Sequence, residues 1–506
     1  MGTITPGLAG IPEQVDVVVV GLGITGAGVA LDAVTRGLSV LAVDAHDLAF
    51  GTSRWSSKLV HGGLRYLAQG QLAIARESAV ERGILMQVTA PHLVHALPML
   101  TPLNDAMPRS RTAMTWGGLQ AGDVLRRAAR TSTRTLPRPR RLNATEALGL
   151  APAMRADTLR GGLLAWDGQL EDDARLVVTV ARTAASYGAR VRTRARVTSA
   201  TGAGVTLRDE LTGEQYDVRA RAVVNATGVW AGDLDDRVRL RPSRGTHLVL
   251  RGSTLPHTRV AVMVPIPGST SRFAMVLPQP DGRLYVGLTD EPVEGPVPDV
   301  PTPSEEEVDF LLGVVAPAFT VPPTRDDVVG AFAGLRPLLE VEGTDESADL
   351  SRRHAILTSS TGVTTVVGGK LTTYRRMAQD TVDALGLTHA PCRTASLPLL
   401  GAVGTSTAPE HLVRRFGADA GLVLATSREV TGLADGDLLT PASPAVPVTL
   451  AELVFAITHE GAHDVDDLLD RRTRAGLVAE DRAIATPLAE RAIELVLSHR
   501  RSAAHA

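Results

Sequence analysis

The chain has 506 residues, of which 44% are apolar and 21% are charged, and its formal net charge is −3. This length exceeds one hydrophobic core, so roughly two or three domains are expected, and the near-neutral charge gives no reason to expect nucleic acid as a partner. The single cysteine, Cys392, excludes an intrachain disulfide and a cysteine metal cluster, and no metal site is predicted.

The chain begins with a stretch, Met1 to Gln14, that lacks the basic start and apolar core of a signal peptide and is predicted to be disordered. The apolar run from Val15 to Val34 contains Asp16, Asp32 and four glycines, so a nucleotide-binding segment explains it better than a membrane span. No other run approaches the roughly twenty apolar residues of a spanning helix. We therefore expect a cytoplasmic protein in which any membrane contact is peripheral, on the inner face of the cell membrane.

A dinucleotide-binding pattern occupies residues 16–44. A β-branched run predicts a buried parallel strand, residues 21–26 read Gly-Leu-Gly-Ile-Thr-Gly, and a helix and a second strand follow. In this pattern Gly21 allows a tight turn, Gly23 lets a pyrophosphate approach the backbone, and Gly26 lets the helix pack closely on the strand. The helix N-terminus offers free N–H groups to the phosphates.

Asp44 closes the second predicted strand, eighteen residues after Gly26, where a ribose-binding acid is expected. Its carboxylate would repel a 2′-phosphate, which disfavours NADP. This stretch by itself leaves NAD and FAD open.

Two polar segments come next. Residues 52–67 combine hydroxyl side chains, glycines and interleaved cations, so they can wrap a polar ligand or form a surface loop that enters a helix over 70–89. Residues 126–141 hold seven arginines, which can meet phosphate or an anionic membrane surface. A solvated face is the more common explanation of such a basic run.

The middle of the chain predicts further strands around one helix. A helix is expected over 172–187, and strands over 191–207 and 216–224. The last strand leads into Ala226-Thr227-Gly228, where the backbone can approach a cofactor. Strands then dominate from 246 to 289, which suggests an antiparallel substrate layer inserted into the nucleotide fold.

Two later segments carry cations beside glycine. Arg336 lies in Gly-Leu-Arg-Pro-Leu at 334–338, and Lys370 follows two glycines at the end of a strand and before a helix. A ligand oxygen could accept the N–H groups of that helix start, next to Lys370. A structural salt bridge explains Arg336 equally well, and a solvated helix start explains Lys370. Residues 409–505 are predicted to be mainly helical.

Together these motifs resemble the FAD-dependent glycerol-3-phosphate dehydrogenase family of the aerobic, quinone-linked type. The resemblance runs from about Val15 to the C-terminal helical region, and it implies FAD rather than NAD. The blocks that carry the resemblance are Gly21–Gly26, Asn225-Ala226-Thr227-Gly228, Gly334–Leu338, Thr52-Ser53 with Ser56-Ser57-Lys58-Leu59 and His61-Gly62-Gly63-Leu64-Arg65-Tyr66-Leu67, and Gly368-Gly369-Lys370-Leu371-Thr372-Thr373-Tyr374-Arg375. The most specific of them are the block that runs through His61 to Leu67 and the block from Gly368 to Arg375.

We accordingly expect an α/β fold, with a doubly wound, Rossmann-like FAD-binding domain, an inserted and mostly antiparallel substrate domain, and a C-terminal helical domain. The predicted boundaries are 13–90, 160–245 and 345–390 for the FAD-binding domain, 91–159 and 246–344 for the substrate or cap domain, and 395–506 for the helical domain.

The resemblance implies oxidation of the C2 hydroxyl of sn-glycerol 3-phosphate to dihydroxyacetone phosphate, with hydride transfer to FAD and electrons passed to a membrane quinone. A phosphate dianion needs more than one cation. Arg65, Arg336 and Lys370 match substrate-site positions, Arg65 and Arg336 also as catalytic residues, and Tyr66 and Thr372 could add hydroxyl donors. His247 matches an active-site histidine and is the expected general base, although an arginine or lysine could instead stabilise an alkoxide.

The cofactor-binding positions that the resemblance implies are Gly21, Gly23, Ile24, Thr25, Gly26, Asp44, Thr52, Ser53, Ser56, Ser57, Leu59, His61, Gly62, Gly63, Val197, Ala226, Thr227, Gly228, Gly369, Lys370, Leu371 and Thr372. The chain departs from the family at Asp44, where glutamate is common, and at 290–292, where only part of a Thr-Asp loop is kept. Low aromatic content leaves the membrane surface unidentified.

Three alternatives stay open: a glycerol-3-phosphate oxidase that reduces oxygen to hydrogen peroxide, an amine or amino-acid oxidase on the same fold, and a non-catalytic flavin-binding module. The three cations favour a phosphate substrate over an amine or amino acid, and their presence together with His247 argues against a non-catalytic module. Hydrogen peroxide yield would separate the dehydrogenase, which we expect, from the oxidase. A homodimer is one of the assemblies that the sequence leaves open.

Overall fold

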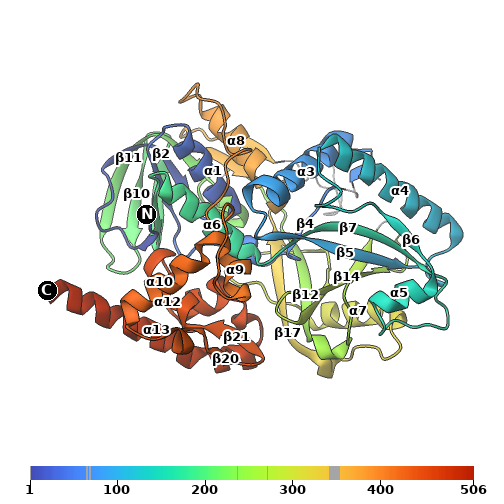
Figure 1. Ribbon diagram of the computed structural model, residues 1–506. Helices are drawn as coiled ribbons and strands as arrows, with labels where there is room; N and C mark the ends of the chain where they lie inside the picture. The colour runs from blue at the N-terminus through green and yellow to red at the C-terminus, as the bar shows by residue number, and fades with distance from the viewer. Residues whose placement is uncertain are drawn as a thin grey trace.

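Two large β-sheets lie side by side, and a helical C-terminal region packs beneath the first of them (Figure 1). The computed structural model describes residues 2–63, 66–67, 70–235, 237–269, 272–340 and 354–505. None of the helices in these ranges combines the length and the apolar character that a membrane span requires.

The first sheet is built around the dinucleotide-binding pattern. Its central strands are parallel, in the order β1-β8-β3-β2-β11, with β19 also parallel to β11, and β10, β9 and β18 add antiparallel edges. The strands are β1 (Thr5–Pro6), β2 (Gln14–Val20), β3 (Val40–Val43), β8 (Arg190–Thr193), β9 (Ala195–Thr201), β10 (Gly204–Asp209), β11 (Gln215–Asn225), β18 (Ala355–Thr358) and β19 (Thr364–Val367).

The valine run of β2 is buried on both faces of this sheet. Val17 and Val19 share a hydrophobic cluster with α1 (Ile24–Thr35), α6 (Asp173–Ser186) and α8 (Tyr374–Leu385). Val18 and Val20 share a different cluster with apolar residues of β9 to β11. A parallel strand covered on both sides has no polar alternation, which is why the sequence shows a continuous apolar run.

The prediction of a disordered N-terminus is wrong. β1 pairs in parallel with β8, and the side chains of Ile4 and Leu8 are buried. The backbone N–H of Leu8 donates to Asp209 Oδ2 at 2.7 Å. This short segment is ordered because it covers the edge of the sheet, a long-range partner that local composition does not reveal.

The second sheet is mostly antiparallel, as predicted, and β5 with β13 is its one parallel pair among the strands described. Its order is β16-β12-β15-β14-β13-β5-β7-β4, with β17 on β12 and β6 on β7. The strands are β4 (Leu59–Val60), β5 (Val94–Pro102), β6 (Arg140–Leu142), β7 (Gly162–Leu170), β12 (Ser243–Arg251), β13 (Ala261–Pro265), β14 (Phe273–Pro278), β15 (Arg283–Gly287), β16 (Glu291–Pro292) and β17 (Val328–Arg336).

Four helices accompany this sheet. Ser304 and Glu307 form a capping box at the start of α7. The predicted helix over 70–89 is α3 continued by a π-helical turn over Leu85–Thr89, and α4 packs on α3 at the outer edge of the molecule (Figure 1). These helices are α3 (Leu72–Ile84), α4 (Arg109–Ala128), α5 (Ala144–Leu150) and α7 (Glu305–Val315).

The C-terminal region is helical, as predicted, with one small hairpin. A core that includes Phe416 and Phe455 holds its helices together. The elements are α9 (Glu410–Phe416), α10 (Ala420–Thr431), α11 (Asp435–Leu439), β20 (Pro441–Ser443), β21 (Val446–Thr449), α12 (Leu450–His459) and α13 (Ala479–His505).

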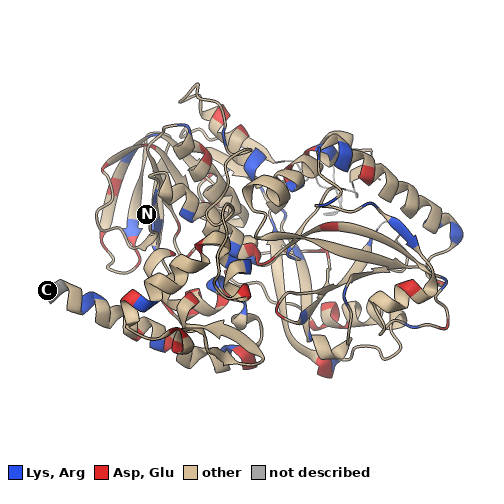
Figure 2. Cartoon of the chain, in the orientation of Figure 1, with Lys and Arg blue, Asp and Glu red and all other residues tan. Residues whose placement is uncertain are grey.

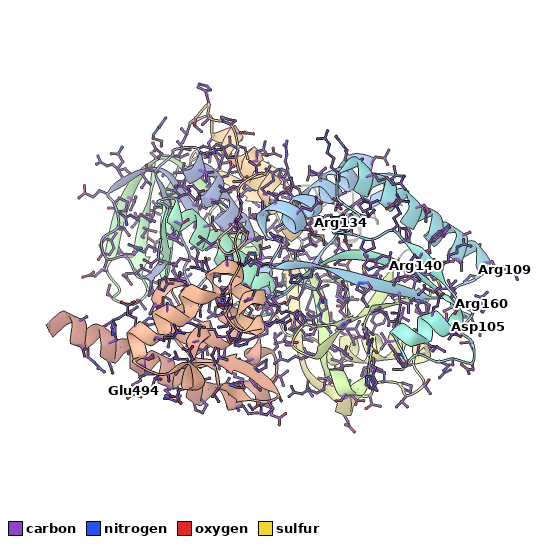
Figure 3. All side chains as sticks on the ribbon, viewed as in Figure 1. Asp105, Arg109, Arg134, Arg140, Arg160 and Glu494 are labelled. Carbon is purple, nitrogen blue, oxygen red and sulfur yellow. The ribbon has the colours of Figure 1, made fainter. Side chains whose placement is uncertain are left out.

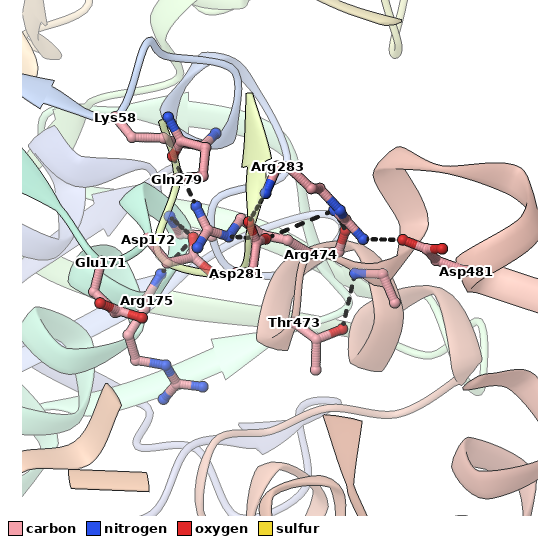
Figure 4. A network of polar contacts seen from close by, with 12 residues as sticks. Lys58, Glu171, Asp172, Arg175, Gln279, Asp281, Arg283, Thr473, Arg474 and Asp481 are labelled. Atoms are coloured by element: carbon pink, nitrogen blue, oxygen red, sulfur yellow. Dashed lines mark hydrogen bonds and ion pairs between the residues drawn. The ribbon is translucent and has the colours of Figure 1, made fainter. Parts of the chain in front are cut away.

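Charged residues gather where this region meets the two sheets (Figure 2). Arg283 of β15 pairs with Asp481 of α13 and donates to the carbonyl oxygen of Arg474 at 2.7 Å, and Arg474 lies 3.5 Å from Asp281 (Figure 4). Removing one partner of such a buried pair typically costs about 3–5 kcal/mol, because the other charge is left unpaired. These contacts fix the C-terminal region against the second sheet.

Candidate active site

An open cavity of about 520 Å³ lies at the carboxyl ends of β2, β3, β11 and β19, and reaches the end of β17. This is the edge of a parallel α/β sheet at which ligands bind. Of the residues predicted to hold a cofactor, those that line the cavity are Gly21, Gly23, Ile24, Thr25, Asp44, Thr52, Ser53, Ser56, Val197, Ala226, Thr227, Gly228, Gly369, Lys370 and Leu371.

The glycine turn brings the N-terminus of α1 to the cavity. Gly21 has φ +96°, and a Cβ there would lie 2.7 Å from the carbonyl oxygen of Ala226. A Cβ on Gly26 would lie 1.8 Å from the carbonyl oxygen of Gly21, so Gly26 sits behind the turn rather than on the cavity. Side chains at these two positions would displace the turn and close the approach of a phosphate to the helix N–H groups.

Asp44 directly follows β3 and contacts the glycine turn at Leu22. Its carboxylate accepts the N–H of Leu22 at 2.7 Å and that of His46 at 2.9 Å. Burial nevertheless raises the pKa of Asp44 to about 6, because desolvation outweighs both hydrogen bonds. Each carboxylate oxygen can accept a further bond, so the position suits a ribose diol.

Only some residues of the hydroxyl-rich segment that begins at Thr52 line the cavity. Thr52 Oγ1 donates to the carbonyl oxygen of Leu335, and Ser53 Oγ accepts the N–H of Ile24. Farther along, Ser57 lies against His247 rather than on the cavity. The predicted cofactor positions that do not line the cavity are Gly26, Ser57, Leu59, His61, Gly62, Gly63 and Thr372.

The cations predicted to bind a substrate come together from distant parts of the chain. Arg336 at the end of β17 and Lys370 before α8 line the same cavity. Arg336 donates to Asp290 Oδ1 at 2.8 Å and to the carbonyl oxygen of Thr289 at 3.2 Å, so it is both salt-bridged and exposed to the cavity. Arg65 lies outside the residues that the structure describes.

Lys370 is held over an aromatic ring. Its Nζ donates to Ser78 Oγ at 2.9 Å and lies 4.0 Å from the centre of the Tyr66 ring. Thr372, two residues on, is buried, and its Oγ1 accepts the backbone N–H of His61 at 3.2 Å. These contacts join His61 and Tyr66 to the segment that leads into α8.

The two histidines of the region differ in exposure. His247 is 1% exposed, stacks on Phe332, and shares a 2.8 Å hydrogen bond between Nε2 and Ser57 Oγ. Burial, with Lys58 and Arg336 nearby, lowers the pKa of His247 to about 3, so its ring is neutral.

The side chain of His61 is 45% exposed, and its Nδ1 lies 3.1 Å from Asp167 Oδ2. Arg82, at 2.6 Å, and His61 hold the pKa of Asp167 at about 2, against the opposing effect of its burial. Asp167 is therefore ionised and can accept a hydrogen bond from Nδ1–H of His61. In the neutral imidazole with this tautomer, Nε2 is the nitrogen that accepts a proton.

Sequence reasoning missed several residues that line the cavity. His46 and Phe50 stack with ring centres 3.9 Å apart, and Trp230 lies 6.4 Å from Phe50. The low aromatic content hid this group, although Trp230 lies two residues after the strand-end segment Ala226-Thr227-Gly228. The other missed lining residues include Arg196, Asp233 and Asp299, which come from three separate segments.

This fold, with a glycine turn on a cavity at the strand ends, defines a dinucleotide-binding α/β protein. The family model described as FAD dependent oxidoreductase matches residues 16–375, and the model described as the C-terminal domain of alpha-glycerophosphate oxidase matches residues 360–500. The cavity fits FAD by its own geometry, because the side-chain-free cradle at Gly21 and the acid Asp44 lie where a pyrophosphate and a ribose are bound.

Two relatives identify the family within this class of oxidoreductases. Glycerol-3-phosphate dehydrogenase 1 of Mycobacterium tuberculosis (strain ATCC 25618 / H37Rv) is 53% identical over 485 residues, which cover 92% of each chain. Glycerol-3-phosphate dehydrogenase 2 of the same strain is 36% identical and covers 93% of this chain and 83% of its own. The chain belongs to the glycerol-3-phosphate dehydrogenase family.

A solved structure agrees with this placement. The glycerol-3-phosphate dehydrogenase from Bacillus halodurans, complexed with FAD, has a TM-score of 0.70 and 28% identity, and the match covers 97% of this chain and 94% of that one. The L-alpha-glycerophosphate oxidase from Mycoplasma pneumoniae shares the fold, with a TM-score of 0.58 and 18% identity.

Proposed function

We propose that the protein oxidises sn-glycerol 3-phosphate to dihydroxyacetone phosphate and passes the electrons to a membrane quinone. The observation that carries the proposal is the meeting of Arg336 and Lys370 on the cavity that begins at the glycine turn. A phosphate dianion matches two converging cations. The names of the relatives support the same substrate.

FAD, when bound, supplies the acceptor for the C2 hydride. The chain's own residues bind and orient the substrate. Asp290 and the carbonyl oxygen of Thr289 fix the guanidinium plane of Arg336, which suits it to a bidentate contact with phosphate oxygens. Lys370, anchored on Ser78 and Tyr66, adds the second positive charge.

The proton of the C2 hydroxyl needs an acceptor. We propose His61 for this role in place of His247. The backbone N–H of His61 is bonded to Thr372, two residues after the cavity residue Lys370, and the His61 side chain is partly exposed with an ionised carboxylate on Nδ1. His247 is enclosed by the protein and engaged with Ser57, so we assign it the positioning of that hydroxyl-rich segment.

The test is an anaerobic absorption spectrum of the purified holoprotein before and after addition of glycerol 3-phosphate. Bleaching of the oxidised flavin bands supports the proposed substrate. A flavin spectrum that glycerol 3-phosphate leaves unchanged, but an amino acid bleaches, would replace the proposal with an amine or amino-acid oxidase.

The second candidate is a glycerol-3-phosphate oxidase, which the match to the alpha-glycerophosphate oxidase C-terminal domain favours. The two differ only in the electron acceptor. Turnover in air that yields about one hydrogen peroxide per substrate oxidised would identify the oxidase. Negligible peroxide, with rapid reduction of a ubiquinone or menaquinone analogue, is the result expected of the dehydrogenase.

A further inference from the structure

The outward stripe of α4 is apolar, although the solvent-facing stripe of a surface helix is normally polar. Met114 is 56% exposed and Val124 is 61% exposed. A Cβ on Gly117 or Gly118 would meet nothing within 4 Å, so the stripe is open. The exposed residues that fall on this stripe are Ser110, Ala113, Met114, Gly117, Gly118, Ala121, Val124 and Ala128.

Arginines surround this stripe. Residues 105–160 contain eleven arginines and four acidic residues, whereas the whole chain carries a net charge of −3. One of those acids, Asp123, is buried and paired with Arg126 and Arg127. The exposed arginines of this segment are Arg109, Arg127, Arg130, Arg134, Arg138, Arg140, Arg141, Arg155 and Arg160.

The basic side chains border the helix rather than interrupt its apolar stripe. Figure 2 shows most of α4 free of charge, with blue at its ends and on β6. Arg109 and Arg160 lie at the outer end of α4, and Arg140 lies on the strand beside it (Figure 3). Arg141 packs over the ring of Trp116, at 4.9 Å, which ties β6 to the flank of the helix.

We propose that this face, defined as the α4 stripe with its bordering arginines, docks on an anionic lipid bilayer, with α4 lying in the plane of the interface. An apolar stripe flanked by cations is the composition that such interfacial helices share. Charge complementarity selects the occupant: anionic lipid headgroups attract the arginines, whereas pairing with a second copy would bring two arginine-rich faces together.

The helix α4 is connected to the proposed site through α3. α4 packs on α3, and Ser78 of α3 holds Lys370 at the cavity. Docking through α4 would therefore place the flavin site near the membrane from which a quinone arrives. The inference extends the proposed quinone-linked activity, but it concerns a different surface and is tested without turnover.

The experiment is flotation of the holoprotein with vesicles of phosphatidylglycerol and phosphatidylcholine, and with vesicles of phosphatidylcholine alone. We expect binding to the anionic vesicles that weakens as salt is raised. The double variant Met114→Glu/Val124→Glu is expected to bind about tenfold more weakly or worse, because both changes place charge on the apolar stripe.

The matched control is Val321→Glu/Val403→Glu, which makes the same charge change at residues 75% and 71% exposed outside α4. Both double variants should keep the flavin and its bleaching by glycerol 3-phosphate, so loss of vesicle binding separates from loss of the proposed activity. Equal flotation of the α4 variant and the control would overturn the proposal. So would a wild-type dimer in light scattering that the α4 variant alone converts to a monomer.

Discussion

The buried carboxylate Asp47 offers a sharp test of how the C-terminal region supports the cofactor site. Asp47 follows Asp44 and His46, which line the cavity, and it is fully buried. Its oxygens accept bonds from Arg471 Nε at 2.7 Å and from Arg472 Nη1 and Nη2 at 2.8 Å. These cations hold the pKa of Asp47 below its usual range, against its desolvation, so it is ionised at neutral pH.

The substitution Asp47→Asn leaves two buried guanidinium groups short of a counter-charge. Breaking a buried pair typically costs about 3–5 kcal/mol. Asp467 and Glu460 lie against the same two arginines and offset part of the loss, so we expect the free energy of unfolding to fall by about 3 kcal/mol. The loop beside Asp44 should loosen as well, with FAD affinity reduced about tenfold or more, which corresponds to about 1.4 kcal/mol.

The assay is urea denaturation of the holoprotein, followed by circular dichroism, together with titration of the apoprotein with FAD. Asp435→Asn is the control, because it breaks an exposed ion pair with Arg428 far from the cofactor loop, and exposed pairs contribute little. If Asp47→Asn denatures at the same urea concentration as the control and binds FAD as tightly, the buried cluster does not hold the cofactor loop.

Three further outcomes are expected. His61→Gln should lower kcat about 100-fold while the protein keeps its full FAD content. His247→Ala should lower kcat much less. If steady-state assays show the reverse order, His247 rather than His61 is the proton acceptor. Arg336→Lys should raise KM for glycerol 3-phosphate about tenfold or more, because lysine lacks the planar fork held by Asp290; an unchanged KM would remove Arg336 from phosphate binding. Burial raises the pKa of Asp44 to about 6 from 3.8, so ionising Asp44 costs the folded apoprotein about 3 kcal/mol relative to the unfolded chain. The protonated form therefore favours folding: this stabilisation is complete below about pH 4 and is lost as the pH rises through 6. Asp44→Asn should flatten that part of the apoprotein's stability profile, and a wild-type profile that matches the variant's would show that Asp44 titrates normally.

The sequence determined the parts of this protein that depend on chain neighbours. A β-branched run, three spaced glycines and a terminal acid fix the turn between β2 and α1, because backbone conformation and close packing there admit few other residues. The capping box of α7 is local in the same sense. The family resemblance then supplied FAD and the expected substrate, which no local pattern distinguishes.

Tertiary structure decided which of the candidate residues meet. Arg336 and Lys370 reach one cavity because β17 and β19 belong to different sheets whose ends converge, a result of topology rather than of spacing. The same holds for the histidines: His247 is enclosed by β17 and Ser57, while His61 lies on Asp167 from β7. Burial and charge pairing depend on the whole fold, so the sequence names the candidates and only the packing of distant segments assigns their chemistry.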